Sequence, residues 1–385
     1  MKISNRENKN YSFDFFYFNT PRVNISCESD TKVNVEFYED NGDLIYRAVL
    51  TNNMFASISR EYHSNFYIKI YDEFNEDLVR PDFTGKRVYI HLDSSSLGDT
   101  IAWFPQVAEF GKEHACHLIC STFNNKFFAG RYPEVEFVEP GTTVPDLYKM
   151  FTIGWFYKEN GEIDYNKNPL DFRDQHLQKT ASDILGLKFS EIRPKLDFEA
   201  QPRPVSKKYF CIANHSTAQA KYWNNPDGWQ DVVDYLVSEN YEVIILSRED
   251  DGYMGNPDPK GGIKLQNKTL LEISNYIYHA EGFIGLGSGL SWLAWALNKK
   301  VILISGFSKP VCEMTECIRI FVPENENFCS GCFNEFKFDQ GDWNWCPRHK
   351  GTDRQFECTK SISSERVING IRKISLPAKN SGVQA

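Results

Sequence analysis

The feature that most constrains the fold of this chain is a change in sequence period near Pro81. Before Pro81, apolar and polar residues alternate at a period of two, which is typical of strands that bury one face. The stretches concerned are YSFDFFYF (11–18), KVNVEFYED (32–40), DLIYRAVL (43–50) and NFYIKIYDE (65–73). Residues 1–82 are therefore predicted to form a β-rich domain, built as a small antiparallel sheet or barrel.

Further along the chain, short continuous apolar runs alternate with segments of helical spacing. RVYIHL (87–92), the first of these runs, has the composition of a strand buried on both faces of a parallel sheet. The alternation predicts βαβ units over 83–205 and again over 206–310, with a proline-containing linker between them. We expect an α/β protein with two Rossmann-like domains facing a cleft, then a cysteine-rich segment (311–362) and a C-terminal helix and tail (363–385).

Composition and charge exclude several classes of protein. The 385 residues are 41% hydrophobic and 25% charged, which fits a folded chain of two or three domains and excludes a disordered one. A net charge of −9 argues against general binding of nucleic acid or anionic membranes. We find no stretch near the ~18 apolar residues of a membrane span, and the first residues lack the apolar core of a secretory signal. We therefore expect a cytoplasmic protein.

Four of the ten cysteines are spaced as metal ligands. Cys329 and Cys332 form a CxxC pair, and Cys346 and Cys358 follow after thirteen and eleven residues. Disulfides are rare in a reducing cytoplasm, and four thiolates can close a tetrahedral shell around one ion. Zinc is the chemical default and iron its main competitor, with His349 as a possible substitute ligand. The alternatives are four unrelated buried thiols, or a redox pair at the CxxC.

A glycine-rich loop follows the predicted strand FIGL. The loop comprises Gly287, Ser288, Gly289, Leu290 and Ser291. Glycines let backbone N–H groups approach a phosphate, and the N-terminus of the following helix favours negative charge. The alternative is an ordinary strand-to-helix turn with a serine cap. The pattern is neither the dinucleotide fingerprint nor a P-loop, so it predicts anion binding only in general terms.

Two further segments follow the carboxyl ends of predicted strands, where open α/β sheets bind ligands. Thr217 and Lys221 lie in the run TAQAKYWNN, where Lys221 could neutralise a diphosphate; a solvated lysine beside a packed tryptophan is the equal alternative. Asp99 follows SSSLG near the start of a predicted helix. It is either the N-cap of that helix or a carboxylate base that the helix dipole keeps ionised, and the two roles are compatible.

Taken together, these segments resemble the bacterial autotransporter heptosyltransferases and, more distantly, the lipopolysaccharide-core heptosyltransferases. The stretches that carry the resemblance, with the CxxC pair, span about 97 to 359: LGDTIAWFP, AQAKYWNN, FIGLGSGLSWLAWA, VILISGFS and WCPRHKGTDRQFECT. The β-rich part is similar in character only. The run Ser-Ser-Ser-Leu before Gly98 departs from the threonine-containing loop that the family leads us to expect.

The resemblance implies a GT-B fold, in which the second Rossmann-like domain holds most of the nucleotide-sugar donor. It implies inverting transfer of heptose from ADP-glycero-manno-heptose to serine hydroxyls of an autotransporter adhesin passenger. Asp99 resembles the family's catalytic base, Lys221 its pyrophosphate-contacting lysine, and Gly287 to Ser291 its donor phosphate loop, with Thr217 a further donor-binding candidate.

The four cysteines resemble the family's metal finger, which carries one iron ion per chain. The resemblance also implies a ring-shaped homo-oligomer, a dodecamer in this family, and a β-rich domain that helps in assembly or acceptor engagement. Two other functions stay open from the sequence. One is a GT-B transferase that uses another nucleotide sugar, and the other is a non-catalytic metal-finger scaffold that binds a partner.

Overall fold

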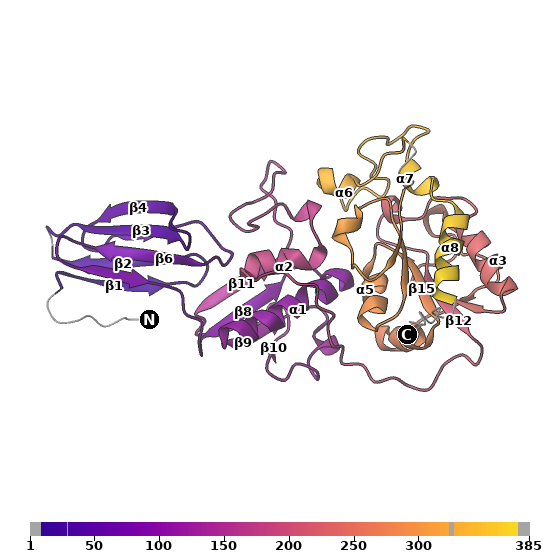
Figure 1. Cartoon of the computed structure of the whole chain (residues 1–385), viewed down its shortest axis with the longest axis horizontal. Helices are drawn as coiled ribbons and strands as arrows, with labels where there is room; N and C mark the ends of the chain where they lie inside the picture. The colour runs from indigo at the N-terminus through magenta and orange to yellow at the C-terminus, as the bar shows by residue number, and fades with distance from the viewer. Residues whose placement is uncertain (1–8, 29, 323–326, 376–385) are drawn as a thin grey trace, which may run out of the picture. The chain divides into compact units, whose positions relative to one another are not determined.

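The computed structural model describes residues 9–28, 30–322 and 327–375 (Figure 1). These residues form two compact units. The first contains the described residues up to Ser95 together with Trp103–Phe172 and Gln178–Ile192, and the second contains Ser96–Ala102, Arg173–Leu177 and the chain from Arg193 onward. The predicted C-terminal tail beyond residue 375 lies outside the described residues.

The β-rich part of the first unit consists of two antiparallel sheets, drawn as stacked layers in Figure 1. Its strands are β1 (Tyr11–Phe16), β2 (Arg22–Cys27), β3 (Val33–Glu39), β4 (Leu44–Leu50), β5 (Phe55–Ser57), β6 (Phe66–Tyr71) and β7 (Glu76–Val79). One sheet has the order β1-β2-β5 and the other β4-β3-β6-β7. In β6, Phe66, Ile68 and Ile70 are buried and the residues between them are partly exposed, which confirms the prediction from the period of two.

The rest of the first unit is built on a parallel sheet. Its elements, some of whose ends belong to the second unit, are β8 (Arg87–Leu92), α1 (Leu97–His114), β9 (His117–Ser121), η1 (Asn125–Phe127), β10 (Glu136–Phe137), β11 (Lys149–Ile153), η2 (Phe172–Asp174) and α2 (Leu177–Leu185). Every pairing in the order β10-β9-β8-β11 is parallel. The apolar run RVYIHL is β8, and it pairs on both edges as its composition predicts.

The second unit is built on a larger parallel sheet. Its elements are β12 (Tyr209–Ala213), η3 (Gln219–Lys221), α3 (Gly228–Ser238), β13 (Glu242–Ile245), η4 (Tyr253–Gly255), β14 (Ile263–Lys264), α4 (Leu270–His279), β15 (Gly282–Leu286), α5 (Gly289–Ala296), β16 (Val301–Ile304), η5 (Pro310–Cys312), β17 (Ile318–Ile320), α6 (Cys332–Glu335), α7 (Glu357–Lys360) and α8 (Ser364–Ser375). The strand order is β14-β13-β12-β15-β16-β17, and every pairing is parallel. This is the order of a doubly wound Rossmann sheet.

Helices pack on this sheet through the apolar positions that the sequence pattern predicts. Val232, Val233 and Leu236 of α3 are fully buried in the core of the second unit. The final helix, α8, contributes Val367 and Ile371 to the same core. The α/β prediction with parallel sheets is therefore confirmed for the described residues. None of the helices in these ranges is long and apolar enough to cross a membrane.

Candidate functional site

The candidate site of the second unit lies where the strand order of its sheet reverses, between β12 and β15. These strands are parallel neighbours, with Ala213 opposite Gly285 at their carboxyl ends. The chain leaves β12 toward Thr217 and Lys221, and it leaves β15 toward the glycine loop at 287–291. Because parallel strands end at one edge of a sheet, the fold brings the two predicted donor-binding segments to the same edge.

Lys221 is half-buried against aromatic rings. Its Nζ lies 5.3 Å from the ring centre of Phe307 and 5.1 Å from that of Phe338. The same nitrogen donates a hydrogen bond of 3.3 Å to Thr217 Oγ1. An ammonium group over two aromatic faces is attracted to both rings, which helps to hold it in place.

Two carboxylates act on the ammonium group of Lys221. Burial lowers the pKa of Lys221, whereas the charges of Asp99 and Glu313 raise it. The three side chains come from different parts of the chain, and only the fold brings them within electrostatic reach of one another. Partial desolvation strengthens each of these interactions, which is the arrangement expected where a charged ligand binds.

The predicted phosphate loop joins β15 to the N-terminus of α5. Ser288 is the N-cap residue of α5, and its Oγ is buried without a hydrogen-bond partner among the described residues. Ser291 differs, because it is fully buried and its hydroxyl donates a hydrogen bond of 2.6 Å to the carbonyl oxygen of Leu286. The Ser288 hydroxyl is thus able to bond a ligand, while the Ser291 hydroxyl braces the loop. Leu290, in the first turn of α5, is partly exposed.

Asp99 lies in the first turn of α1, which packs against the first turn of α5. The two helix starts meet at glycines. A Cβ atom on Gly289 would lie 2.9 Å from Leu97 Cβ and 3.0 Å from the Gly98 nitrogen, and one on Gly98 would lie 3.3 Å from Gly289 Cα. Because neither glycine carries a side chain, two helix N-termini with their positive dipole ends lie next to each other.

The hypothesis that Asp99 is an N-cap is wrong. Helix α1 begins at Leu97, so Asp99 is its third residue and lies inside the first turn. The carboxylate still lies near the positive end of α1, where the helix dipole favours its ionised form.

Sequence reasoning missed Glu313, which lies beside this site. Ser308 donates a hydrogen bond of 2.8 Å to Glu313 Oε1, and Arg319 Nη1 lies 3.4 Å from the same oxygen. A Cβ atom on Gly287 would lie 3.2 Å from that oxygen, so the carboxylate lies directly over the glycine loop. The one sequence signal was that this segment follows the carboxyl end of β16, at the same edge of the sheet.

The four predicted metal-ligand cysteines gather in the segment after β17. Cys329 is partly exposed, and Cys332, Cys346 and Cys358 are buried. Burial raises the pKa of Cys358, and negative charge on the other three sulfurs raises it further. Burial and repulsion from neighbouring anionic groups raise the pKa of Cys329 to about 12. A bound cation would hold such thiols as thiolates at neutral pH, so the donor set fits a metal ion.

A different set of side chains comes close enough together to hold one ion, and it shares only Cys329 with the four predicted cysteines. Side-chain atoms of Cys329, His349 and Glu357 lie within 4.8 Å of one another. Arg354 donates two hydrogen bonds of 2.7 Å to the Glu357 carboxylate, and the Cys329 N–H donates another of 2.9 Å. Because the hydrogen bonds from Arg354 favour its ionised form, the pKa of Glu357 is lowered to about 2. Glu357 is thus better placed to support Cys329 than to bind a metal, and His349 is the alternative ligand.

The cysteine segment also forms one wall of the lysine site. Cys332 and Cys346 share an apolar core with Ala220, which precedes the lysine in η3. The Gln219 N–H donates a hydrogen bond of 3.1 Å to the carbonyl oxygen of Trp343. The segment predicted to bind a metal and the loop predicted to bind the donor are therefore packed against each other.

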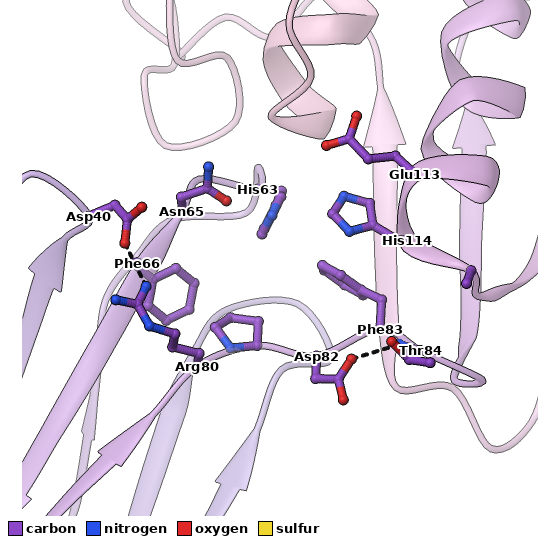
Figure 2. Close-up of a pocket in the computed structure, with 12 residues that line it drawn as sticks. Asp40, His63, Asn65, Phe66, Arg80, Asp82, Phe83, Thr84, Glu113 and His114 are labelled. Carbon is purple, nitrogen blue, oxygen red and sulfur yellow. Dashed lines mark hydrogen bonds and ion pairs between the residues drawn. The ribbon is translucent and has the colours of Figure 1, made fainter.

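A separate cavity of about 260 Å³ lies in the first unit, between the β-rich sheets and the end of α1 (Figure 2). His63 and His114 line it with ring centres 5.5 Å apart, and the Phe83 ring packs edge-on against both. Burial lowers the pKa of His63 to about 3, so this imidazole is neutral at physiological pH. The predicted site residues do not line this cavity, and its aromatic contacts hold two parts of the unit together.

Relatives of known activity identify the family. A profile described as Glycosyltransferase family 9 (heptosyltransferase) matches residues 173–315. The autotransporter heptosyltransferase TibC of Escherichia coli O78:H11 is 37% identical over 341 residues, 85% of this chain and 82% of TibC. This chain belongs to the autotransporter heptosyltransferase family. A further member, BAHTCr of Citrobacter rodentium, is 36% identical over 360 residues, 90% of this chain and 85% of that protein.

The three-dimensional structure of TibC agrees with this assignment. A crystal structure of TibC, described as a dodecameric iron-containing heptosyltransferase in complex with ADP-D-β-D-heptose, matches with a TM-score of 0.83 and 32% identity. The match covers 97% of this chain and 99% of the TibC chain. The family resemblance predicted from the sequence is confirmed, and so is an α/β glycosyltransferase fold with parallel sheets. The heptosyltransferase family assignment makes this protein a glycosyltransferase.

Proposed function

We propose that this chain transfers heptose from ADP-glycero-manno-heptose to serine hydroxyls of an autotransporter adhesin passenger, with inversion at the anomeric carbon. The observation that carries the proposal is the convergence of Asp99, Lys221 and the glycine loop at one edge of the second sheet. TibC, a relative of similar length, is crystallised with ADP-D-β-D-heptose, which supports the choice of donor. Its description as an autotransporter heptosyltransferase supports the choice of acceptor.

The proposed reaction is a single displacement. The serine oxygen attacks the anomeric carbon while the bond from that carbon to the diphosphate oxygen breaks, and ADP leaves. Asp99 accepts the serine proton, since a base is needed as the hydroxyl becomes a nucleophile. Negative charge develops on the departing diphosphate, where Lys221, the Ser288 hydroxyl and the N-terminus of α5 can stabilise it.

We further propose that Cys329, Cys332, Cys346 and Cys358 bind one iron ion per chain, with zinc as the alternative. The iron in TibC supports this choice, as do the electrostatic interactions of Cys358 with the other three cysteines. The role is structural, because a shell of four thiolates leaves no position for substrate. An absorbance spectrum with elemental analysis decides between iron and zinc, and a protein that purifies with neither metal contradicts the proposal.

The larger organisation is proposed on the same basis. We propose a GT-B arrangement with the divisions predicted from the sequence: a β-rich domain (1–82), two Rossmann-like domains (83–205 and 206–310), a metal finger (311–362) and a C-terminal helix and tail (363–385). The dodecameric TibC supports a large ring for this chain as well. We propose that the protein acts in the cytoplasm, where the nucleotide-sugar donor is available.

Co-expression with a candidate passenger tests the function. Intact-mass analysis of the passenger is expected to show mass increases in steps of one heptose with the wild-type chain. Asp99→Ala is expected to lower the initial rate by about 100- to 10,000-fold, the range for losing a general base, while metal content and melting temperature stay unchanged. Lys221→Ala is expected mainly to weaken donor binding. A passenger whose mass does not change with the wild-type chain and ADP-heptose would contradict the proposal.

A further inference from the structure

Glu313 is a buried carboxylate beside the donor site to which the proposed reaction gives no role. It is only 7% exposed, and it follows η5 in the segment between β16 and β17. The protein holds it by one oxygen: Ser308 donates a hydrogen bond to Oε1, and Arg319 Nη1 faces that same atom. Oε2 accepts no hydrogen bond from any residue in the described ranges. One acceptor atom of a firmly positioned carboxylate is thus left over.

The glycine loop is shaped around this carboxylate. The side chain of any residue at 287 would begin 3.2 Å from Glu313 Oε1 and 3.7 Å from Ser305 Oγ. Such a contact with oxygen is tight, so a larger residue at 287 would displace the carboxylate from the loop. Gly287 therefore leaves the space above the loop to a side chain that arrives from elsewhere in the chain.

The chemistry of a carboxylate limits what Glu313 can recognise. An ionised carboxylate only accepts hydrogen bonds, and the oxygens of a diphosphate also only accept them, so the two repel each other. Sugar hydroxyl groups donate hydrogen bonds, and a charged acceptor makes these bonds stronger than a neutral one does. Glu313 also lies within electrostatic reach of Lys221, the group proposed to meet the diphosphate. A carboxylate in that position is suited to the sugar that is attached to the diphosphate.

We propose that Glu313 determines donor-sugar recognition, by accepting hydrogen bonds from hydroxyl groups of the sugar through Oε2. Ser308 and Arg319 position the carboxylate, and Gly287 gives it room. This inference rests on the proposed function, because it assumes that an ADP-sugar occupies the site. It adds to that function a residue that distinguishes the sugar from the nucleotide part of the donor.

Calorimetric binding of ADP and of ADP-heptose to the full-length protein, without acceptor, tests the inference. The wild-type protein is expected to bind ADP-heptose more tightly than ADP, and the ratio of the two dissociation constants measures the contribution of the sugar. Glu313→Gln is expected to change ADP affinity by less than about twofold and to reduce that ratio by about tenfold, the value of one hydrogen bond to a charged group. Ser308→Ala, which loosens the carboxylate without removing it, is expected to reduce the ratio less.

Glu316→Gln is the matched control. This glutamate lies in the same segment but is 74% exposed and pairs with Arg193, so its variant is expected to bind both ligands as the wild type does. Unchanged ADP affinity also shows that Glu313→Gln is folded. The inference is overturned if Glu313→Gln keeps the wild-type ratio, or if it loses ADP and ADP-heptose affinity equally. If the wild-type protein binds neither ligand, the proposed function itself fails, which is a different result from a preserved ratio.

Discussion

Because the starts of α1 and α5 are in close contact, adding one methyl group at Gly289 is expected to lower turnover strongly. Gly289→Ala would place a Cβ atom 2.9 Å from Leu97 Cβ and 3.0 Å from the Gly98 nitrogen. Ordinary contacts of a Cβ atom begin at 3.4 Å, so the two helix starts must separate by about 0.4 to 0.5 Å. The backbone angle φ at Gly289 is not in the left-handed region, so the variant tests the available space and adds no backbone strain.

The separation moves Asp99 away from Lys221 and the glycine loop. A misplacement of 1 Å can cost about 100-fold in rate, so a shift of half that size is expected to lower kcat about tenfold. Overpacking lowers the free energy of unfolding by about 1–3 kcal/mol, and the reduced conformational freedom of the unfolded chain raises it by about 0.4–1 kcal/mol. The protein is therefore expected to remain folded, with a melting temperature lower by several degrees at most.

The assay combines the initial rate of passenger modification with calorimetric binding of ADP. Gly289→Ala is expected to lower kcat about tenfold while ADP affinity falls less than about threefold, because Lys221 lies on a different loop of the second unit. Gly341→Ala is the control, since the new Cβ atom there meets only the carboxylate of Asp339, whose side chain can move. Wild-type turnover by Gly289→Ala would refute the reasoning, and so would an equal loss of turnover and ADP binding.

Three further predictions follow from buried groups. Burial lowers the pKa of Lys149 to about 7, whereas a lysine in an unfolded chain has a pKa of ~10.4. Between these two values the unfolded state binds more protons than the folded state. The free energy of unfolding is therefore expected to rise from pH 7 to 9. In urea unfolding, Lys149→Met is expected to lose this rise, and an unchanged pH dependence would contradict the assignment. Phe338→Leu removes one aromatic face from the Lys221 ammonium, an interaction worth about 1 kcal/mol. This variant is expected to raise the KM for the donor about fivefold without changing the metal content. Phe336→Leu, at a ring that is 37% exposed, is its control. Cys346→Ser is expected to lower both the metal content and the melting temperature. Cys27→Ser, in the β-rich sheets, is expected to leave both quantities unchanged. Equal effects of the two variants would argue against a four-cysteine site.

The sequence predicted those strands that are long enough to show a hydrophobic pattern. The strand β6 and the buried strand β8 have enough residues to show alternation or a continuous apolar run. The short edge strands β5, β14 and β17 have two or three residues each, too few to show a period. Helix α2 was missed for another reason, because it buries polar side chains. The side-chain amide of Gln178 donates a hydrogen bond to the Ile192 carbonyl oxygen and accepts one from the Ile192 N–H. No local sequence pattern reveals this pairing.

The candidate site was predictable wherever one rule sufficed. Ligands bind beyond the carboxyl ends of parallel strands, and this rule led to Lys221 and Asp99, while the glycines and the following helix start pointed to the loop at 287–291. Glu313 was missed because its position depends on the path of the chain after β16, which the residue pattern does not specify. The N-cap hypothesis for Asp99 failed because the preference of a residue for caps does not specify at which residue a helix begins. Local rules thus located the edge of the sheet, and tertiary contacts decided the geometry at that edge.

The structure of the cysteine-rich segment suggests why the proposed metal site would be useful in an enzyme whose proposed reaction does not use the metal. Between Ile320 and Ser364, the described residues form α-helix only in the four-residue α6 and α7, so backbone structure alone provides little rigidity there. Metal binding can supply the missing folding free energy. The segment then presents Phe338 to the Lys221 ammonium and the Trp343 carbonyl to the Gln219 N–H. Since a lysine loses conformational entropy when it is fixed, a rigid wall lowers the cost of holding Lys221 in position for the proposed contact with a diphosphate. Cys346→Ser and Phe338→Leu are therefore both expected to weaken ADP binding, and only the cysteine variant is expected to lose metal.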